Sequence, residues 1–148
     1  MKKKTRWPLA LDDAKAILRS VDLRCTAARI AVLQCLQASS CPMTPADIAD
    51  TLADYGFDKS TIYRSLTELH DSGKVTRLDL GDSVRRFELL TEAGDGTSEH
   101  PHFMCVDCGE VVCMADFTVE LRPSSTGSRP PGIVSEVLVR GHCDSCCS

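Results

Sequence analysis

The sequence predicts an α+β chain of two units, and three observations support this prediction. Residues 1–90 combine helical apolar spacing with two β-like runs. In residues 102–148, three short β-like runs surround two Cys-x-x-Cys pairs and are expected to be strands: Phe103–Cys105, Val111–Met114 and Ile133–Val139. A polar, glycine-containing stretch at residues 91–101 separates these two regions and is predicted to be a linker or hinge. Charge divides at the same place: residues 1–90 carry 14 Lys+Arg and 12 Asp+Glu, whereas residues 91–148 carry 3 and 9. We therefore expect the two units to have different partners.

Three helices are predicted first. One runs from Asp12 to about Ser20, and Thr26 is placed to cap the second. Residues 44–47, Thr-Pro-Ala-Asp, predict the start of the third helix. They supply a capping hydroxyl, a proline in the first turn and an acid three residues after the cap. This helix is expected to stop near Gly56.

A fourth helix and a hairpin complete the first unit. The helix begins at residues 58–60 and ends before Gly73. Two β-like runs, Lys74–Leu80 and Val84–Leu90, follow with a short turn between them. Helices followed by a β-hairpin are the pattern of a winged helix-turn-helix domain, which binds double-stranded DNA.

The polar side chains of the fourth helix predict a DNA-binding surface. Hydroxyls and backbone amides at its start can hold phosphate, Arg64 can reach guanine edges or phosphate, and Tyr63 can contact a thymine methyl. A merely solvated helix face would carry similar residues, but the hairpin and the basic N-terminus favour DNA. The candidate DNA-binding residues from this reasoning are Ser60, Thr61, Tyr63, Arg64, Lys2, Lys3 and Lys4.

The two Cys-x-x-Cys pairs predict a structural zinc site. Cys105 and Cys108 form one pair, Cys143 and Cys146 the other, and two such turns can supply the four thiolates of a tetrahedral cage. Disulfides and a thioredoxin-type redox pair are the alternatives. The odd number of cysteines, nine, disfavours a set of disulfides. The absence of a βαβ pattern around the pairs disfavours a thioredoxin-type redox pair. A cage closed by four cysteines also leaves no open position for water, which argues against a zinc hydrolase.

The N-terminal residues bear on the cellular compartment. Basic residues are followed by an apolar stretch of only Trp7 to Leu11, which contains Pro8 and ends at Asp12. This stretch is too short for a signal peptide or a membrane span. We therefore expect a cytoplasmic protein with no membrane partner, where thiols stay reduced and bind zinc.

Five segments, in order along the chain, resemble motifs of the ferric-uptake-regulator family of metal-responsive transcription factors. They are Leu23–Arg29, Ser60–Leu66, Arg86–Leu89, His100–Gly109 and Cys143–Cys146. The resemblance implies a homodimeric repressor that binds a DNA operator through the first domain and dimerises through a small α/β zinc-containing second domain. It also implies roles for Arg24 and Arg29 in DNA binding.

The same resemblance implies a second divalent metal, zinc or iron, at a sensor site. Glu88, His100 and His102 fall on the family's sensor-ligand positions. A metal held by all three would fix the wing and thereby the spacing of two recognition helices in a dimer. The sensor role is therefore separate from the structural role of the four cysteines.

Two cysteines depart from the family pattern. Cys41 and Cys113 stand near sensor positions where nitrogen or oxygen ligands are usual. Thiolates favour zinc over iron or manganese, so the sequence favours zinc sensing and the zinc-uptake-regulator branch. Two alternatives stay open: Cys41 and Cys113 are buried side chains without metal, or the chain is an iron- or peroxide/redox-responsive regulator on the same scaffold.

The segment Leu121–Gly132, LRPSSTGSRPPG, is the largest departure. The family usually has an amphipathic helix here that supports the dimer interface, but these prolines and glycines are incompatible with a long helix. Any helix is expected to be confined to residues 116–122 or to be replaced by strand and loop.

Overall fold

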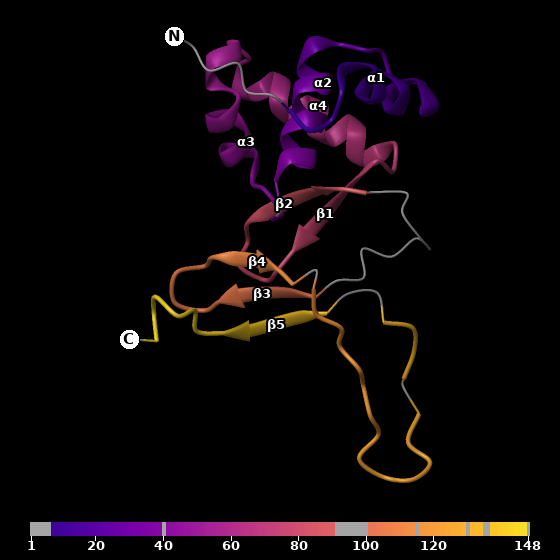
Figure 1. The fold of residues 1–148 in the computed structure, drawn as a ribbon, viewed down its shortest axis with the longest axis vertical. Coiled ribbons are helices and arrows are strands. Elements are labelled where there is room, and N and C mark those ends of the chain that lie inside the picture. Colours follow the sequence, from indigo (N-terminus) through magenta and orange to yellow (C-terminus); the bar gives the residue numbers. More distant parts are fainter. Residues whose placement is uncertain are drawn as a thin grey trace. The chain divides into compact units, whose positions relative to one another are not determined.

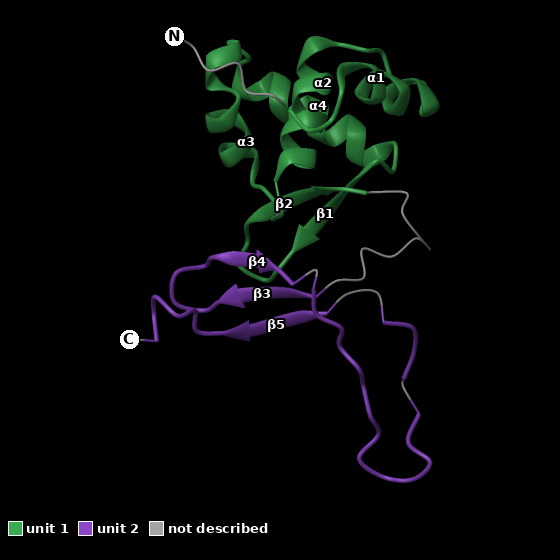
Figure 2. Ribbon diagram, in the orientation of Figure 1, with its two compact units in different colours: residues 1–91 green, residues 92–148 purple. Residues whose placement is uncertain are grey.

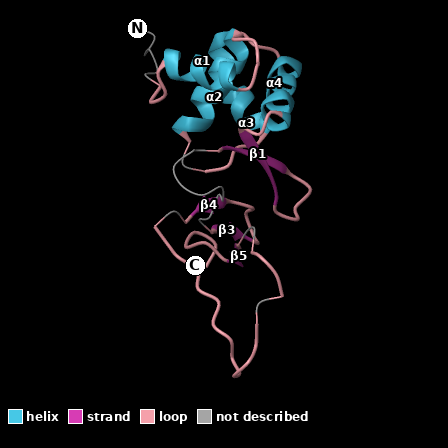
Figure 3. Cartoon of the chain, turned by 90° about the vertical axis from the view of Figure 1, so that its right-hand side faces the viewer, coloured by secondary structure: helices cyan, strands magenta, loops and turns pink. Residues whose placement is uncertain are grey.

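The computed structural model describes residues 7–39, 41–90, 101–114, 116–129, 131–134 and 137–147. The chain divides into two compact units, Met1–Thr91 and Glu92–Ser148, which are coloured separately in Figure 2. All helices of the described residues lie in unit 1, and each unit has its own small sheet (Figures 1 and 3).

Unit 1 has the predicted order of helices followed by a hairpin. Its elements are α1 Leu11–Ser20, α2 Ala27–Ala38, α3 Pro45–Thr51, the 3₁₀ turn η1 Ala53–Tyr55, α4 Lys59–Asp71, β1 Val75–Asp79 and β2 Arg85–Leu89. The apolar spacing of these helices builds one core. Its largest fully buried side chains include Leu18, Leu33, Ile48, Leu52, Ile62, Leu66 and Leu69.

The helix starts follow from their capping residues, as predicted. The Thr26 hydroxyl accepts a hydrogen bond from the Arg29 amide, and Thr44 and Asp47 form a reciprocal capping box. Gly56 and Gly73 adopt positive φ angles of 74° and 77°, which glycine tolerates at little cost. These glycines allow the chain to turn after η1 and after α4.

The hairpin that follows α4 is an antiparallel pair with Val75 opposite Leu89. Phe87 of β2 also forms an isolated antiparallel bridge with Met43, in the segment before α3. This bridge attaches the hairpin to the helical part of unit 1, and Phe87 is buried in the core.

Unit 2 contains a three-stranded sheet of order β4-β3-β5. Its strands are β3 His102–Cys105, β4 Val111–Cys113 and β5 Leu138–Gly141; β3 pairs antiparallel with β4 and parallel with β5. Few side chains are buried among the described residues of this unit. They are Pro101, His102, Met104 and Cys105.

Two expectations for unit 2 change. The expected strand from Ile133 to Val139 is wrong in its bounds, because β5 begins at Leu138 and Ile133 is 98% exposed. The prediction starts at Ile133 because residues 133–139 are mostly apolar, but the strand that pairs with β3 covers residues 138–141. The α element expected in this domain is not present among its described residues: residues 116–122 are not helical, which agrees with the predicted replacement by loop.

Among the described residues, no helix has the length and apolar character needed to cross a membrane.

Candidate functional site

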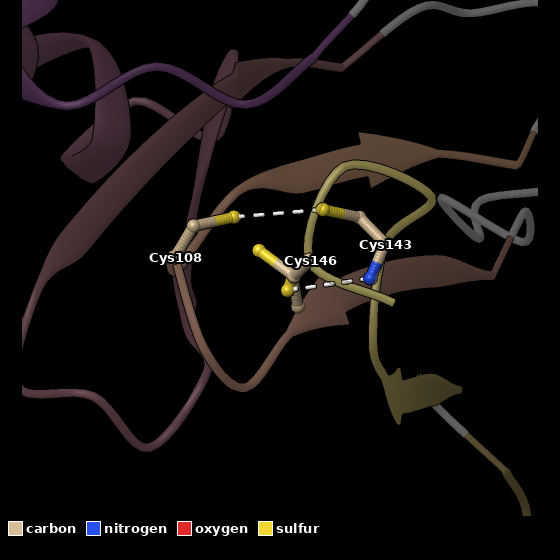
Figure 4. Close-up of side chains that lie close together, drawn as sticks. Cys108, Cys143 and Cys146 are labelled. Atoms are coloured by element: carbon tan, nitrogen blue, oxygen red, sulfur yellow. Dashed lines mark hydrogen bonds between the residues drawn. The ribbon is translucent and has the colours of Figure 1, made fainter. Parts of the chain in front are cut away.

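The four predicted zinc thiols converge in unit 2. Cys105 ends β3, Cys108 follows in the next turn, and Cys143 and Cys146 lie in the turn after β5. Their sulfur atoms all lie within 4.8 Å of one another, and the sulfurs of Cys108 and Cys143 are 3.8 Å apart. In Figure 4 the sulfurs of Cys108, Cys143 and Cys146 point toward one another. Sulfurs at tetrahedral corners, each about 2.3 Å from a zinc ion, are about 3.8 Å apart, so the cluster fits zinc.

Pairing of β3 with β5 brings the two cysteine pairs together. The parallel register places Cys105 beside Gly141, and the Val106 amide donates to the Gly141 carbonyl at 2.9 Å. Each pair lies in a tight turn: the Gly109 amide donates to the Cys105 carbonyl, and the Cys146 amide donates to the Cys143 carbonyl. Residues 35 positions apart in sequence therefore become neighbours through one strand pair.

The cluster favours one thiolate even before a metal binds. Backbone hydrogen bonds, first at Cys108 and then at Cys143, lower the pKa of Cys105 to about 6. The Cys143 amide donates to the Cys105 sulfur at 3.4 Å. Hydrogen bonds with neighbouring thiols, first with Cys143, raise the pKa of Cys146 to about 12. A metal held by four thiolates must therefore displace protons from the cluster, so its binding weakens in acid.

A hydrogen-bonded pair that the sequence did not predict joins the two zinc turns. Asp107, in the first turn, lies 2.5 Å from Nδ1 of His142, which precedes Cys143. The hydrogen bond with Asp107 raises the pKa of His142. Both residues adjoin the cysteine motifs, but their spacing along the chain gives no signal that they meet.

The candidate sensor residues of unit 2 are cross-strand neighbours. His102 of β3 lies opposite Cys113 of β4. A ring nitrogen of His102 and the sulfur of Cys113 lie within 4.8 Å of each other, and His102 is only 1% exposed. Imidazole and thiolate together form a donor pair that suits zinc.

The remaining sensor candidates belong to unit 1 or lie outside the described residues. Glu88 is half-buried on β2, opposite Thr76. Cys41 precedes the Met43–Phe87 bridge, so its segment runs along the same strand that carries Glu88. His100 and nearly all of the predicted linker lie outside the residues that the structure describes.

Helix α4 exposes three of its predicted DNA-binding residues, Ser60, Tyr63 and Arg64. Tyr63 and Arg64 of α4 face solvent, with Tyr63 46% exposed. The start of α4 differs from the predicted phosphate site. The Asp58 carboxylate accepts hydrogen bonds from the Thr61 amide and the Ser60 hydroxyl, both at 2.8 Å. Because a carboxylate already occupies these donors, this helix end is a poor place for a phosphate.

Arg29, for which the family resemblance implies a role in DNA binding, is engaged within unit 1. Its Nε and NH2 groups donate to Glu68 of α4, and its NH1 group donates to the Arg24 carbonyl at 2.7 Å. Arg24 itself is exposed. Lys2, Lys3 and Lys4 lie outside the described residues. Sequence inspection missed the pairing of Glu68 with Arg29. The i,i+4 spacing of Arg64 and Glu68 signals that Glu68 can form an ion pair, but it does not identify Arg29 as the partner.

The hairpin has a stabilised tip and two exposed cations that sequence inspection also missed. Asp82 pairs with Arg86 at 2.8 Å, and the hydrogen bond from Arg86 lowers the pKa of Asp82. Arg77 and Arg85 are exposed on β1 and β2. Their alternation with buried neighbours is the sequence signal of outward-facing strand positions.

A cavity of about 450 Å³ lies within the loop of residues 121–134. Its lining contains no His, Cys, Asp or Glu, so it offers no metal ligands of the kinds found in the two clusters. The candidate chemistry of unit 2 therefore lies at its sheet rather than in this cavity.

Comparisons with known proteins agree with this arrangement. The family model for the ferric uptake regulator family matches residues 20–128. The ferric uptake regulation protein of Vibrio parahaemolyticus is 33% identical over 115 residues, covering 76% of this chain and 74% of that protein. The crystal structure of the Vibrio cholerae ferric uptake regulator superposes with a TM-score of 0.64 at 24% identity, covering 87% of this chain and 98% of that one. A zinc uptake regulator complexed with zinc and DNA matches with a TM-score of 0.55 at 21% identity, covering 93% and 92%.

Proposed function

Because this chain belongs to the ferric uptake regulator family, we propose that it is a metal-dependent repressor that senses zinc. Family membership makes it a transcription regulator and not an enzyme, as the sequence predicted. The fold is also the predicted α+β type, with an N-terminal DNA-binding domain and a C-terminal dimerisation domain. Regulators of this family are metal-responsive, bind DNA and act as dimers. We propose below which metal this chain senses and which of its residues bind that metal and the operator.

The four-cysteine cluster is proposed to hold a permanent zinc ion. Cys105, Cys108, Cys143 and Cys146 supply a closed donor set, and zinc bound there would cross-link the ends of β3 and β5. The described residues of unit 2 bury few side chains, so such a cross-link would contribute much of the stability of this unit. We assign this cluster a structural role because four thiolates leave no position for exchange.

The pairing of His102 with Cys113 is the observation that supports zinc sensing. These side chains meet across β3 and β4, and a sulfur donor favours zinc over iron or manganese. Glu88 and His100 are proposed from the sequence motifs to complete the ligand set. Cys41 is retained as a further, weaker candidate because a thiol there would also favour zinc.

Each unit has a separate part in the proposed mechanism. Residues 1–90 bind the operator through α4 and the hairpin, residues 91–101 act as the hinge, and residues 102–148 dimerise and hold metal. A sensor metal, when bound, would attract the donor atoms of Glu88, His102 and its other ligands to one point. Glu88 would thereby couple β2 to metal binding, and the bound state would favour one spacing of the two recognition helices.

The proposed homodimer would bury apolar side chains that unit 2 leaves exposed. Phe117, Val119 and Leu121 alternate with polar residues, as in a half-buried strand, yet they are between 41% and 66% exposed. Family regulators act as dimers, so a second copy is the proposed cover for this segment. This loop would then replace the interface helix that the prolines preclude.

Substitution of His102 tests the sensor proposal. His102→Ala is expected to weaken metal-stimulated binding to an operator duplex at least about tenfold, since one of few ligands is lost. His70→Gln, which removes a histidine of α4 outside both metal clusters, is the matched control and should leave the stimulation intact. The zinc content of the four-cysteine cluster should stay unchanged in both variants. Unaltered stimulation in His102→Ala would refute the assignment.

Iron sensing is the second candidate function. The observation that favours it is the similarity to proteins named ferric uptake regulation protein, one of them 33% identical. The two candidates differ in the ion that promotes operator binding at the lowest free concentration.

A further inference from the structure

Arg29 and Glu68 form an ion pair between two helices of unit 1. Arg29 Nε and NH2 lie 2.9 and 2.5 Å from the same Glu68 oxygen, and Arg29 NH1 lies 2.7 Å from the Arg24 carbonyl. The Arg29 side chain is 14% exposed and that of Glu68 is 34% exposed. Two donors of one guanidinium thus join the start of α2 to the third turn of α4, and the third donor bonds the segment before α2.

Glu68 is placed where it can interfere with Arg64. Residues 61, 64 and 68 follow the spacing of one helix stripe, so the Glu68 carboxylate lies one turn beyond the Arg64 guanidinium. Such i,i+4 partners pair on helix surfaces when nothing competes. Here Glu68 bonds to Arg29, and no ion pair or hydrogen bond of the Arg64 side chain occurs among the described residues.

We propose that Arg29 is a positioning residue for DNA recognition, which captures Glu68 and so keeps Arg64 available to DNA. This inference rests on the proposed DNA-binding function. The Arg29 guanidinium neutralises a carboxylate that would otherwise repel phosphate and pair with Arg64. It also holds the third turn of α4, one turn after Arg64, against the start of α2.

A direct phosphate contact by Arg29 predicts the opposite response to loss of Glu68. If Arg29 bound phosphate, Glu68→Gln would release it, tighten DNA binding and steepen the salt dependence by about one phosphate contact. If Arg29 instead only captures Glu68, Glu68→Gln leaves a cation that makes no phosphate contact, so the salt dependence of binding stays that of the parent.

The test measures binding of the metal-loaded full chain to a duplex selected by the parent protein from a random library, at several salt concentrations. Arg29→Met should weaken binding about tenfold, the effect of freeing one negative charge about 4 Å from cationic or phosphate partners. The double variant Arg29→Met/Glu68→Gln should recover to within about threefold of the parent, with an unchanged salt slope. Arg29→Lys, which keeps the charge, should retain most of the affinity.

Asp71→Asn is the matched control for the rescue, because it removes an exposed carboxylate at the end of α4. It should fail to restore binding in the Arg29→Met background. Equal losses in Arg29→Met and the double variant, with a salt slope reduced by about one contact, would overturn the proposal.

Thermal unfolding separates this inference from the proposed function and detects misfolding. If Arg29 and Glu68 interact, the change in the melting temperature of unit 1 in the double variant should differ from the sum of the changes in Arg29→Met and Glu68→Gln. Additive effects overturn the pairing whether or not DNA binds. If the parent selects no duplex, the proposed function fails even when the unfolding coupling is found.

Discussion

At the scale of single residues, two carboxylates stabilise α4, the proposed recognition helix. Asp58 caps its start, and Glu68 receives the guanidinium of Arg29. The family motif implied a role for Arg29 in DNA binding but not its pairing with Glu68, because a motif does not reveal a charge on another helix. The Thr26 and Thr44 caps were predictable, since capping depends on residues three positions apart.

Removal of the Asp58 cap tests its role in holding α4. Asp58→Ala should lower the melting temperature of unit 1 by about 4 °C at neutral pH, because the Thr61 amide loses its acceptor. The hydrogen bond from that amide is the main cause of the lowered pKa of Asp58. The cap therefore stabilises the fold above the unfolded-state pKa and is lost as pH falls through the lower folded-state pKa.

The difference between the parent and Asp58→Ala should accordingly disappear in acid, as measured by circular dichroism melts across a pH series. Asp54→Ala, in the exposed turn η1, is the control and should have little effect. A difference that does not shrink as pH falls below the unfolded-state pKa of about 3.9 would contradict a charged cap.

At the scale of elements, the helices and the hairpin followed from local signals, whereas the sheet of unit 2 did not. Apolar spacing and turn residues placed α1 to α4 within a few residues of their observed bounds. The start of β5 depends on pairing with β3, which the composition of residues 133–139 does not encode. Convergence of the cysteine pairs could be predicted because zinc coordination is itself a constraint on the fold.

Loss of one thiol tests the link between the cysteine cluster and the β3–β5 pairing. Cys143→Ser should release the structural zinc and expose the amides of both strands to hydrogen exchange, because metal binding and folding are coupled in such small sites. Cys147→Ser is the matched control, since Cys147 is exposed and lies outside the cluster. The measurements are zinc content by mass spectrometry and exchange rates at residues 102–105 and 138–141. Full zinc content with unchanged protection in Cys143→Ser would contradict the structural role.

At the scale of the whole molecule, the charge division along the sequence agrees with a chain of two units. The basic excess lies in the helical unit that carries α4, and the acidic region holds the four-cysteine cluster. The family predicted from five motifs is confirmed, because residues 20–128 match its model. The identity of the sensed metal is harder to predict than the family, because a change of one ligand from oxygen or nitrogen to sulfur alters metal selectivity on the same fold. Cys113, opposite His102, is the residue on which the proposal of zinc sensing rests.

Operator binding titrated with free Zn²⁺, Fe²⁺ and Mn²⁺ tests the central claim most directly. The protein should start with its four-cysteine zinc retained, and bound metal should be counted in parallel. We expect zinc to promote binding at a free concentration at least about tenfold below that of iron or manganese, with one further equivalent bound per chain. Operator binding that is independent of added metal, or that responds first to iron or manganese, would contradict zinc-dependent repression.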